Sequence, residues 1–197
     1  GVTTIAVKIR SSERLAAQSE NKLSVIATRV LPTRSGGMWT IDTPTRSITA
    51  FAAYIAKSIG YTDDQIDLAQ FDELESIWLP RGDYYDWVHD EGTVSDSINQ
   101  VMQAGFSQLT IERGKIRPVR DAVRTVYEQM YTPQNMTQAL QRSLDAIRPD
   151  DSDGVDVEFV NADTWTSDVV ECRIPGDLGI KVEKIKVDGV TSRTKAW

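Results

Sequence analysis

The sequence predicts an α+β fold in which strand-rich flanks bracket a helix-rich centre. Residues 1–31 and 154–188 alternate apolar and polar positions, which is typical of half-buried strands. Residues 44–120 instead carry many apolar residues three and four positions apart, the spacing of helices that bury one face. We therefore expect β-barrel or sheet elements from both flanks, with a small α/β domain inserted between them.

This pattern divides the chain into three parts. Residues 1–38 together with 130–190 are predicted to form a β-rich barrel domain, and residues 39–129 the inserted α+β domain. Residues 191–197 are the start of a truncated following element, because Thr191 or Ser192 suits a helix cap and the chain then stops. We expect a fragment of a longer polypeptide.

Composition limits the possible functions. With 197 residues, of which 40% are hydrophobic, the chain can bury a sizeable core. Its apolar runs are only a few residues long, so no membrane insertion is expected, and the first ten residues do not resemble a signal peptide. A net charge of −7 argues against broad nucleic-acid binding. The lysines and arginines of residues 181–195 are interpreted as a solvated strand face.

In the first half, strands are expected at 3–9 and 22–30, followed by a loop over 32–44. Pro44 suits the first turn of a helix that ends at Gly60, and a second helix is predicted from 64 to 79, where Pro80 and Gly82 stop it.

The stretch 81–120 carries the densest local signals. A short strand is expected at 84–89. Thr93 is predicted to cap a helix with Asp96 as its third residue, and Gly105 to end it. Strands at 106–112 and 115–119 then flank a tight turn.

The remaining elements are mostly strands. Residues 136–147 have helical spacing of apolar residues, although their composition also suits a strand. Strands are predicted at 155–160, 166–174 and 180–187, separated by turns rich in Asp, Asn, Gly and Pro.

No constellation of residues identifies an active site. His89 and Cys172 lie on separate predicted strands without a third orienting residue. The acidic residues near His89 are Asp83, Asp86, Asp90 and Glu91, and a solvated edge is favoured over a cation site or an acid–base pair. Asp150, Asp151 and Asp153 indicate turn chemistry rather than calcium binding. We predict no catalytic, cofactor-binding or metal-binding residues and no cofactor.

The triplet Arg81-Gly82-Asp83 spells a cell-adhesion tripeptide, but Gly82 is better explained as a helix stop. Three-residue matches arise often by chance, so an adhesion role is not expected.

Several motifs, in order and spacing, resemble the tail tip attachment protein J family, the host-specificity or tail hub proteins of long-tailed phages and prophages. They cover most of the chain: ENKLSVIATRVLP (20–32), RGDYYD (81–86), Thr93, AGF (104–106), GKIRPVRD (114–121), TPQNMT (132–137), DGVDVEFVNADTW (153–165) and VEKIKVDGVTSRTKAW (182–197). None of these motifs is catalytic by itself.

The resemblance implies a fold similar to the phage baseplate and tail hub, with 136–147 as a strand. It implies a structural module, not an enzyme, that closes the distal tail tube and takes part in host attachment and DNA ejection. The expected partners are two further copies in a trimer and the tail tube, tape measure and distal tail proteins, with no specific nucleic-acid sequence bound. The expected location is the tail tip of the virion, after synthesis in the bacterial cytoplasm.

Two alternatives stay open. One is a cell-wall or polysaccharide-cleaving tail enzyme domain, for which Asp86 with Asp90 or Glu91 supplies the only carboxylate pair. The other is a glycan- or receptor-binding module that uses exposed Trp39, Tyr84 and Tyr85.

Overall fold

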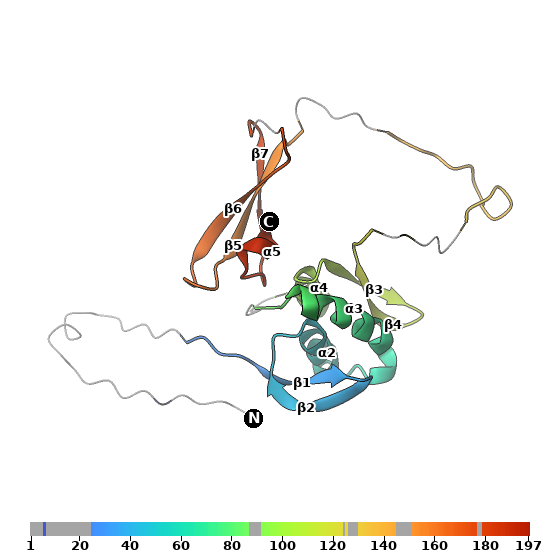
Figure 1. Ribbon diagram of the computed structural model, residues 1–197. Coiled ribbons are helices and arrows are strands. Elements are labelled where there is room, and N and C mark those ends of the chain that lie inside the picture. Colours follow the sequence, from blue (N-terminus) through green and yellow to red (C-terminus); the bar gives the residue numbers. More distant parts are fainter. Residues whose placement is uncertain are drawn as a thin grey trace.

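The computed structural model describes residues 6, 25–86, 92–123, 125, 130–144, 151–176 and 179–197. Helices occupy the centre of the chain and strands lie on both sides, so the predicted α+β class is confirmed (Figure 1). The elements, in chain order, are β1 (Val30–Ser35), β2 (Met38–Pro44), α2 (Ile48–Ser58), the short 3₁₀ helix η1 (Asp63–Gln65), α3 (Leu68–Arg81), α4 (Val94–Gln103), β3 (Ser107–Glu112), β4 (Lys115–Arg120), β5 (Gly154–Val160), β6 (Ser167–Arg173), β7 (Val182–Lys186) and α5 (Arg193–Ala196).

The strands of the described residues form three separate open sheets rather than a closed barrel. Strands β1 and β2 pair antiparallel, as do β3 and β4. In the third sheet β5 lies between β6, to which it is antiparallel, and β7, to which it is parallel. No ladder joins the described strands of the two flanks. The predicted strand at 3–9 lies outside the described residues, apart from Ala6.

The predicted loop over 32–44 is wrong, because β1 and β2 form a hairpin there. Gly36 and Gly37 make its two-residue turn with φ angles of 57° and 79°, which glycine adopts without strain. The pairing register shifts between Pro32 and Arg34. Such a bulge lets a proline sit in a strand without breaking the ladder.

This hairpin is attached to the helices, since β1 packs on α2 and the Arg34 Nε lies 2.6 Å from a carboxylate oxygen of Asp72 in α3. The predicted domain boundary between Met38 and Trp39 falls inside the hairpin. The hairpin therefore goes with the helices in the described structure.

Helix α2 begins later than its predicted start near Pro44, because Pro44 ends β2 and pairs with Val30. Ser47 is the N-cap, and its hydroxyl accepts a hydrogen bond from the backbone N–H of Ala50 at 3.1 Å. The predicted end at Gly60 is close, since the last helical residue is Ser58.

Helix α3 also differs from its prediction at both ends. Asp67, after the short 3₁₀ helix, caps it, and it runs through Pro80 to Arg81. Gly82, in the left-handed conformation with φ 72°, ends it. Its inward face carries Phe71, Leu74 and Trp78.

The capped helix and the hairpin of residues 93–120 match their predictions closely. Thr93 and Asp96 form the predicted capping box at the start of α4, and Ile98, Val101 and Met102 are buried. Strands β3 and β4 pair in register across the Arg113–Gly114 turn.

Replacing Thr93 with alanine should reduce the free energy of unfolding by about 1 kcal/mol, because its hydroxyl accepts from the Asp96 N–H at 3.2 Å. Urea denaturation followed by circular dichroism measures this loss. Ser95→Ala is the matched control, since Ser95 is exposed on the same helix. A loss of equal size in both variants would contradict a capping role.

The three strands predicted between 155 and 187 are confirmed. β5 begins one residue earlier than predicted, and β6 and β7 are shorter than predicted. Residues 136–144 are different: they form neither the helix nor the strand that the sequence allows, and 145–147 lie outside the described residues. Figure 1 shows the described residues 130–144 well away from both the helices and the three-stranded sheet. Leu140 and Leu144 are about four-fifths exposed, so no packed face stabilises a helix there.

A single cluster of buried apolar residues extends from the helices to the C-terminal sheet. Trp78, Phe71 and Met102 lie at its helical end, and Phe159 and Val190 at its C-terminal end. The more extensive packing between helices and strands lies within one part or the other: α2 packs on α4, α4 on β3, and α5 on β5. Among the described residues, no helix is long and apolar enough to cross a membrane.

Candidate functional site

Two segments that are distant in the sequence meet where the helical part contacts the C-terminal part. One is the loop 83–86 after α3, and the other is the segment 189–195 that leads into α5. We call this contact the joint. Its polar residues are Arg46, Arg81, Asp83, Asp86, Thr191 and Lys195.

Asp83 is the most deeply buried charge of the joint, with a side chain that is fully inaccessible. One carboxylate oxygen lies 2.9 Å from the Lys195 ammonium, and the other accepts from the Arg81 guanidinium at 2.8 Å. Two cations therefore compensate one buried carboxylate, and one of them comes from the far end of the chain. A buried charge of this kind is tolerated only while its partners stay in place.

Asp86 fixes the joint from a second side. Its backbone N–H donates to the Gly189 carbonyl at 3.0 Å, and its carboxylate accepts from the Thr191 hydroxyl at 2.6 Å. The same carboxylate binds the Arg46 guanidinium, and this hydrogen bond raises the pKa of Arg46. Asp86 is therefore bound by both parts of the molecule.

Tyr85 lies between these two acids and is 3% exposed. Its ring packs edge to face on Phe51, with ring centroids 5.4 Å apart. Its hydroxyl has no hydrogen-bond partner among the described residues. Burial, together with the negative charge of Asp188, raises the pKa of Tyr85 to about 12.

This pKa predicts a loss of stability in alkali. The unfolded tyrosine ionises near pH 10 and the folded one near 12, so the unfolded state binds fewer protons in that window. The buried, neutral Tyr85 hydroxyl contributes its full share to the free energy of unfolding below pH 10. This share, about 2–3 kcal/mol, is lost as the pH rises through 12. Tyr85→Phe should remove this part of the pH dependence and leave stability at pH 7 unchanged or slightly higher.

Urea denaturation of both proteins at pH 8 and at pH 10.5 to 11.5 measures the difference. Tyr54→Phe is the control, because Tyr54 is 41% exposed. Parallel pH curves for the wild type and Tyr85→Phe would contradict a buried hydroxyl at the joint.

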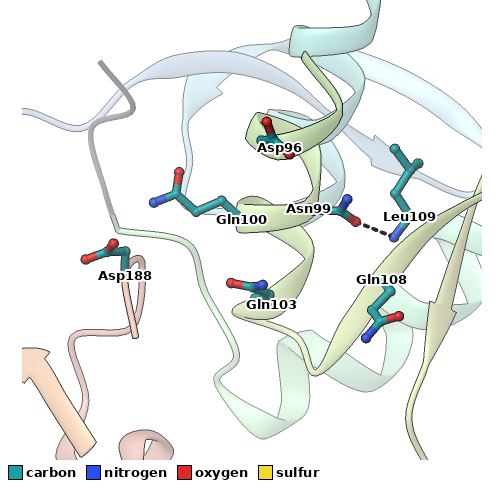
Figure 2. Close-up of a pocket in the computed structure, with 7 residues that line it drawn as sticks. All are labelled: Asp96, Asn99, Gln100, Gln103, Gln108, Leu109 and Asp188. Atoms are coloured by element: carbon teal, nitrogen blue, oxygen red, sulfur yellow. Dashed lines mark hydrogen bonds between the residues drawn. The ribbon is translucent and has the colours of Figure 1, made fainter. Parts of the chain in front are cut away.

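A polar groove with a volume of about 530 Å³ lies beside the joint (Figure 2). Its lining contains the amides of Asn99, Gln100, Gln103 and Gln108 and the carboxylates of Asp96 and Asp188. Asp188 comes from the C-terminal part, and the others come from α4 and β3. Asn99 accepts a hydrogen bond from the Leu109 N–H at 2.8 Å. Next to the groove, the contact between the helical part and the C-terminal part is therefore lined by polar side chains and is accessible to solvent.

The structure changes the interpretation of the acidic cluster predicted from the sequence. Residues 83–86 are not a strand, and Asp83 and Asp86 both take part in the joint instead of pointing to opposite faces. His89, Asp90 and Glu91 lie outside the described residues. The pairing of Asp86 with Asp90 or Glu91 therefore stays a prediction.

The Arg81-Gly82-Asp83 triplet is not displayed for an adhesion receptor. Asp83 is buried, and Arg81 is its ion-pair partner. Gly82 is the helix stop that the sequence predicts. The adhesion tripeptide is therefore a structural feature of the joint.

The aromatic residues predicted as an exposed glycan surface do not form one. Tyr85 is buried. The Lys57 ammonium lies 4.0 Å from the centroid of the Trp39 ring, and the Arg46 guanidinium 4.8 Å from that of Tyr84. These cation–π contacts occupy ring faces on which a sugar would have to stack.

Cys172 and Asp153, the other residues considered as candidate sites, make contacts that stabilise the fold. The Cys172 sulfur lies 3.8 Å from the carbonyl oxygens of Ala196 and Trp197. The Asp153 carboxylate accepts from the backbone N–H groups of Ile180 and Lys181, so it holds a segment distant in sequence rather than only its own turn. Among the described residues, no group of three or more His, Cys, Asp or Glu side chains is placed to hold a metal ion.

No model of a known protein family matches the chain, and no curated protein matches it. The fold defines a mixed α+β module, and the polar residues of the joint hold its two parts together.

Proposed function

We propose that the chain is a structural module of a phage or prophage tail tip (hub) protein that closes the distal tail tube and takes part in host attachment and DNA ejection. One observation carries the proposal. The motifs RGDYYD (81–86) and VEKIKVDGVTSRTKAW (182–197), on which the resemblance to the tail tip attachment protein J family rests, meet at the joint. In such a module, the residues of the motifs stabilise the fold and do not take part in catalysis.

The exposed apolar residues support an assembly role. Met38 and Ile41 on β2 are 72% and 82% exposed, and Ile111 on β3 is 69% exposed. Ile174 and Ile180, beside β6 and β7, are nearly four-fifths exposed. Open sheet edges with outward apolar side chains are a liability in a solitary protein, and neighbouring subunits can cover them.

The proposed partners are two further copies of the chain and the tail tube, tape measure and distal tail proteins, at the tail tip of a virion made in the bacterial cytoplasm. The hub-like barrel of the proposal needs strands beyond the three open sheets, and neighbouring subunits would supply them.

The proposed role is not enzymatic. What supports this is the state of Asp86, which Arg46 and Thr191 hold in an ion pair and a hydrogen bond. A general acid or base must be free to change its protonation, and a nucleophilic carboxylate must be free to reach the substrate.

The mass of the protein in solution tests the proposed self-association. Light scattering across a hundredfold range of concentration should show a species approaching three times the 22.0 kDa of one chain at the upper end. A monomer at every concentration would argue against a trimeric hub.

A further inference from the structure

We propose that the joint also forms between copies: residues 189–195 of one copy dock on the loop 83–86 of a second copy of this chain. The loop 83–86 of one copy thus binds the C-terminal part of a neighbouring copy through the same contacts that the structure shows within one chain. This inference rests on the self-association in the proposed function and names the surface that carries it.

The first observation is the length of the covalent link. Residues 121–153 connect β4 to β5, and none of the described residues among them belongs to a helix or strand. Connections between elements of a compact domain are commonly only about 4–6 residues long. At about 3.3 Å per residue, a link of this length reaches on the order of 100 Å when extended. The C-terminal part can therefore reach a neighbouring molecule without breaking its own fold.

The second observation is the self-sufficiency of the C-terminal part. Strands β6, β5 and β7 pair only with one another among the described residues, and α5 packs on β5. Val157, Phe159 and Val170 are buried there. This unit can move as one body, because its ladders do not depend on strands of the helical part.

The third observation is the chemistry of the contact. Asp83 meets Lys195, Asp86 meets Thr191 and Gly189, and a polar groove lies alongside. These are directional contacts, so they specify one partner segment and one register. In a copy whose own C-terminal part has left, Asp83 keeps Arg81 but lacks Lys195, and Asp86 keeps Arg46 but lacks Thr191. The matching cation and hydroxyl on a neighbour then replace the missing partners.

Exchange of an identical element between copies requires no new interface chemistry. When each copy donates its C-terminal part to the next, the contact is head to tail, and the ring closes if the rotation between copies allows it. A closed ring of three copies would have the mass of the trimer expected for the hub.

A complementation experiment tests the exchange. The loop variant carries Asp83→Asn and Asp86→Asn, and the segment variant carries Thr191→Val and Lys195→Met. In either variant alone, no joint is complete, whether within or between chains. In a mixture, the segment variant's intact loop can receive the loop variant's intact C-terminal segment, and only between copies. Different affinity tags and native mass spectrometry report mixed complexes.

The matched controls are Asp64→Asn and Lys184→Met, at exposed positions away from the joint.

We expect mixed complexes at least tenfold more abundant in the mixture than self-complexes in either variant alone. Circular dichroism checks that each variant retains its secondary structure. If a variant fails to fold, the single substitutions Asp86→Asn and Thr191→Val replace the pairs. If the wild type forms trimers but the mixture yields no excess of mixed complexes, the exchange is overturned and the proposed function stands. If the wild type is a monomer at every concentration, both fail.

Discussion

Gly105→Ala is expected to lower the free energy of unfolding by about 2–4 kcal/mol. A Cβ atom at Gly105 would lie 2.3 Å from Nε1 and 2.6 Å from Cε2 of Trp78, and 2.9 Å from Cδ1 of Ile48. Trp78 is completely buried and cannot move aside without displacing its neighbours. Its indole N–H also donates to the Gly105 carbonyl at 2.9 Å, and a displaced ring would leave the indole N–H unpaired, while the carbonyl keeps the Ser107 hydroxyl at 3.1 Å.

A double-mutant cycle isolates this contact. Trp78→Phe removes the indole nitrogen, the atom nearest to the new methyl group, so the combined variant should be less destabilised than the sum of the two single variants. Gln103→Ala, at an exposed site on the preceding turn, should change stability by less than about 0.5 kcal/mol. Additive losses in urea denaturation would show that Gly105 does not accommodate Trp78.

Phe159→Ala is expected to cost about 3–5 kcal/mol and to act on the C-terminal part. Phe159 is 1% exposed on the central strand β5, on the face that the apolar cluster covers. Truncation leaves a cavity in the middle of a three-stranded sheet, which has no further layer of strands among the described residues to close over it.

Hydrogen exchange by residue distinguishes a local from a global effect. Faster exchange in β5, β6 and β7 with little change in α2 and α4 is the expected result. Glu158→Ala is the control on the opposite, exposed face of the same strand. Equal acceleration throughout the molecule would show that the C-terminal part has no stability of its own.

Elements with a local chemical signal were predictable from the sequence. The Thr93–Asp96 capping box located the start of α4, and the Arg113–Gly114 pair located the turn of the β3–β4 hairpin. In both elements, residues that are close in the sequence satisfy the backbone hydrogen bonds. The local sequence therefore predicts these elements without information about the rest of the fold.

Elements that depend on distant contacts were predicted less well. Prolines at 32 and 44 suggested a loop, but a register shift and the packing of β1 on α2 allow a hairpin there. Residues 136–144 have an acceptable pattern for a helix or a strand, but among the described residues nothing packs on them. Periodicity alone cannot show whether a partner surface exists.

The joint could not be predicted from local patterns. Lys195 belonged to a basic stretch interpreted as solvated, yet its ammonium reaches a buried carboxylate far away in the sequence. Thr191 or Ser192 was expected to cap a helix. Ser192 is the N-cap of α5, and the Thr191 hydroxyl instead donates to Asp86. The resemblance pointed to both segments without indicating that they touch.

Immunogold labelling of particles released by the cells that carry this sequence is the most direct measurement of the proposed role. Antibodies raised against the purified protein should label the distal end of long tails and leave heads and tube walls unlabelled. Particles with unlabelled tail tips, together with protein found only in the particle-free fraction of the lysate, would contradict a tail-tip module.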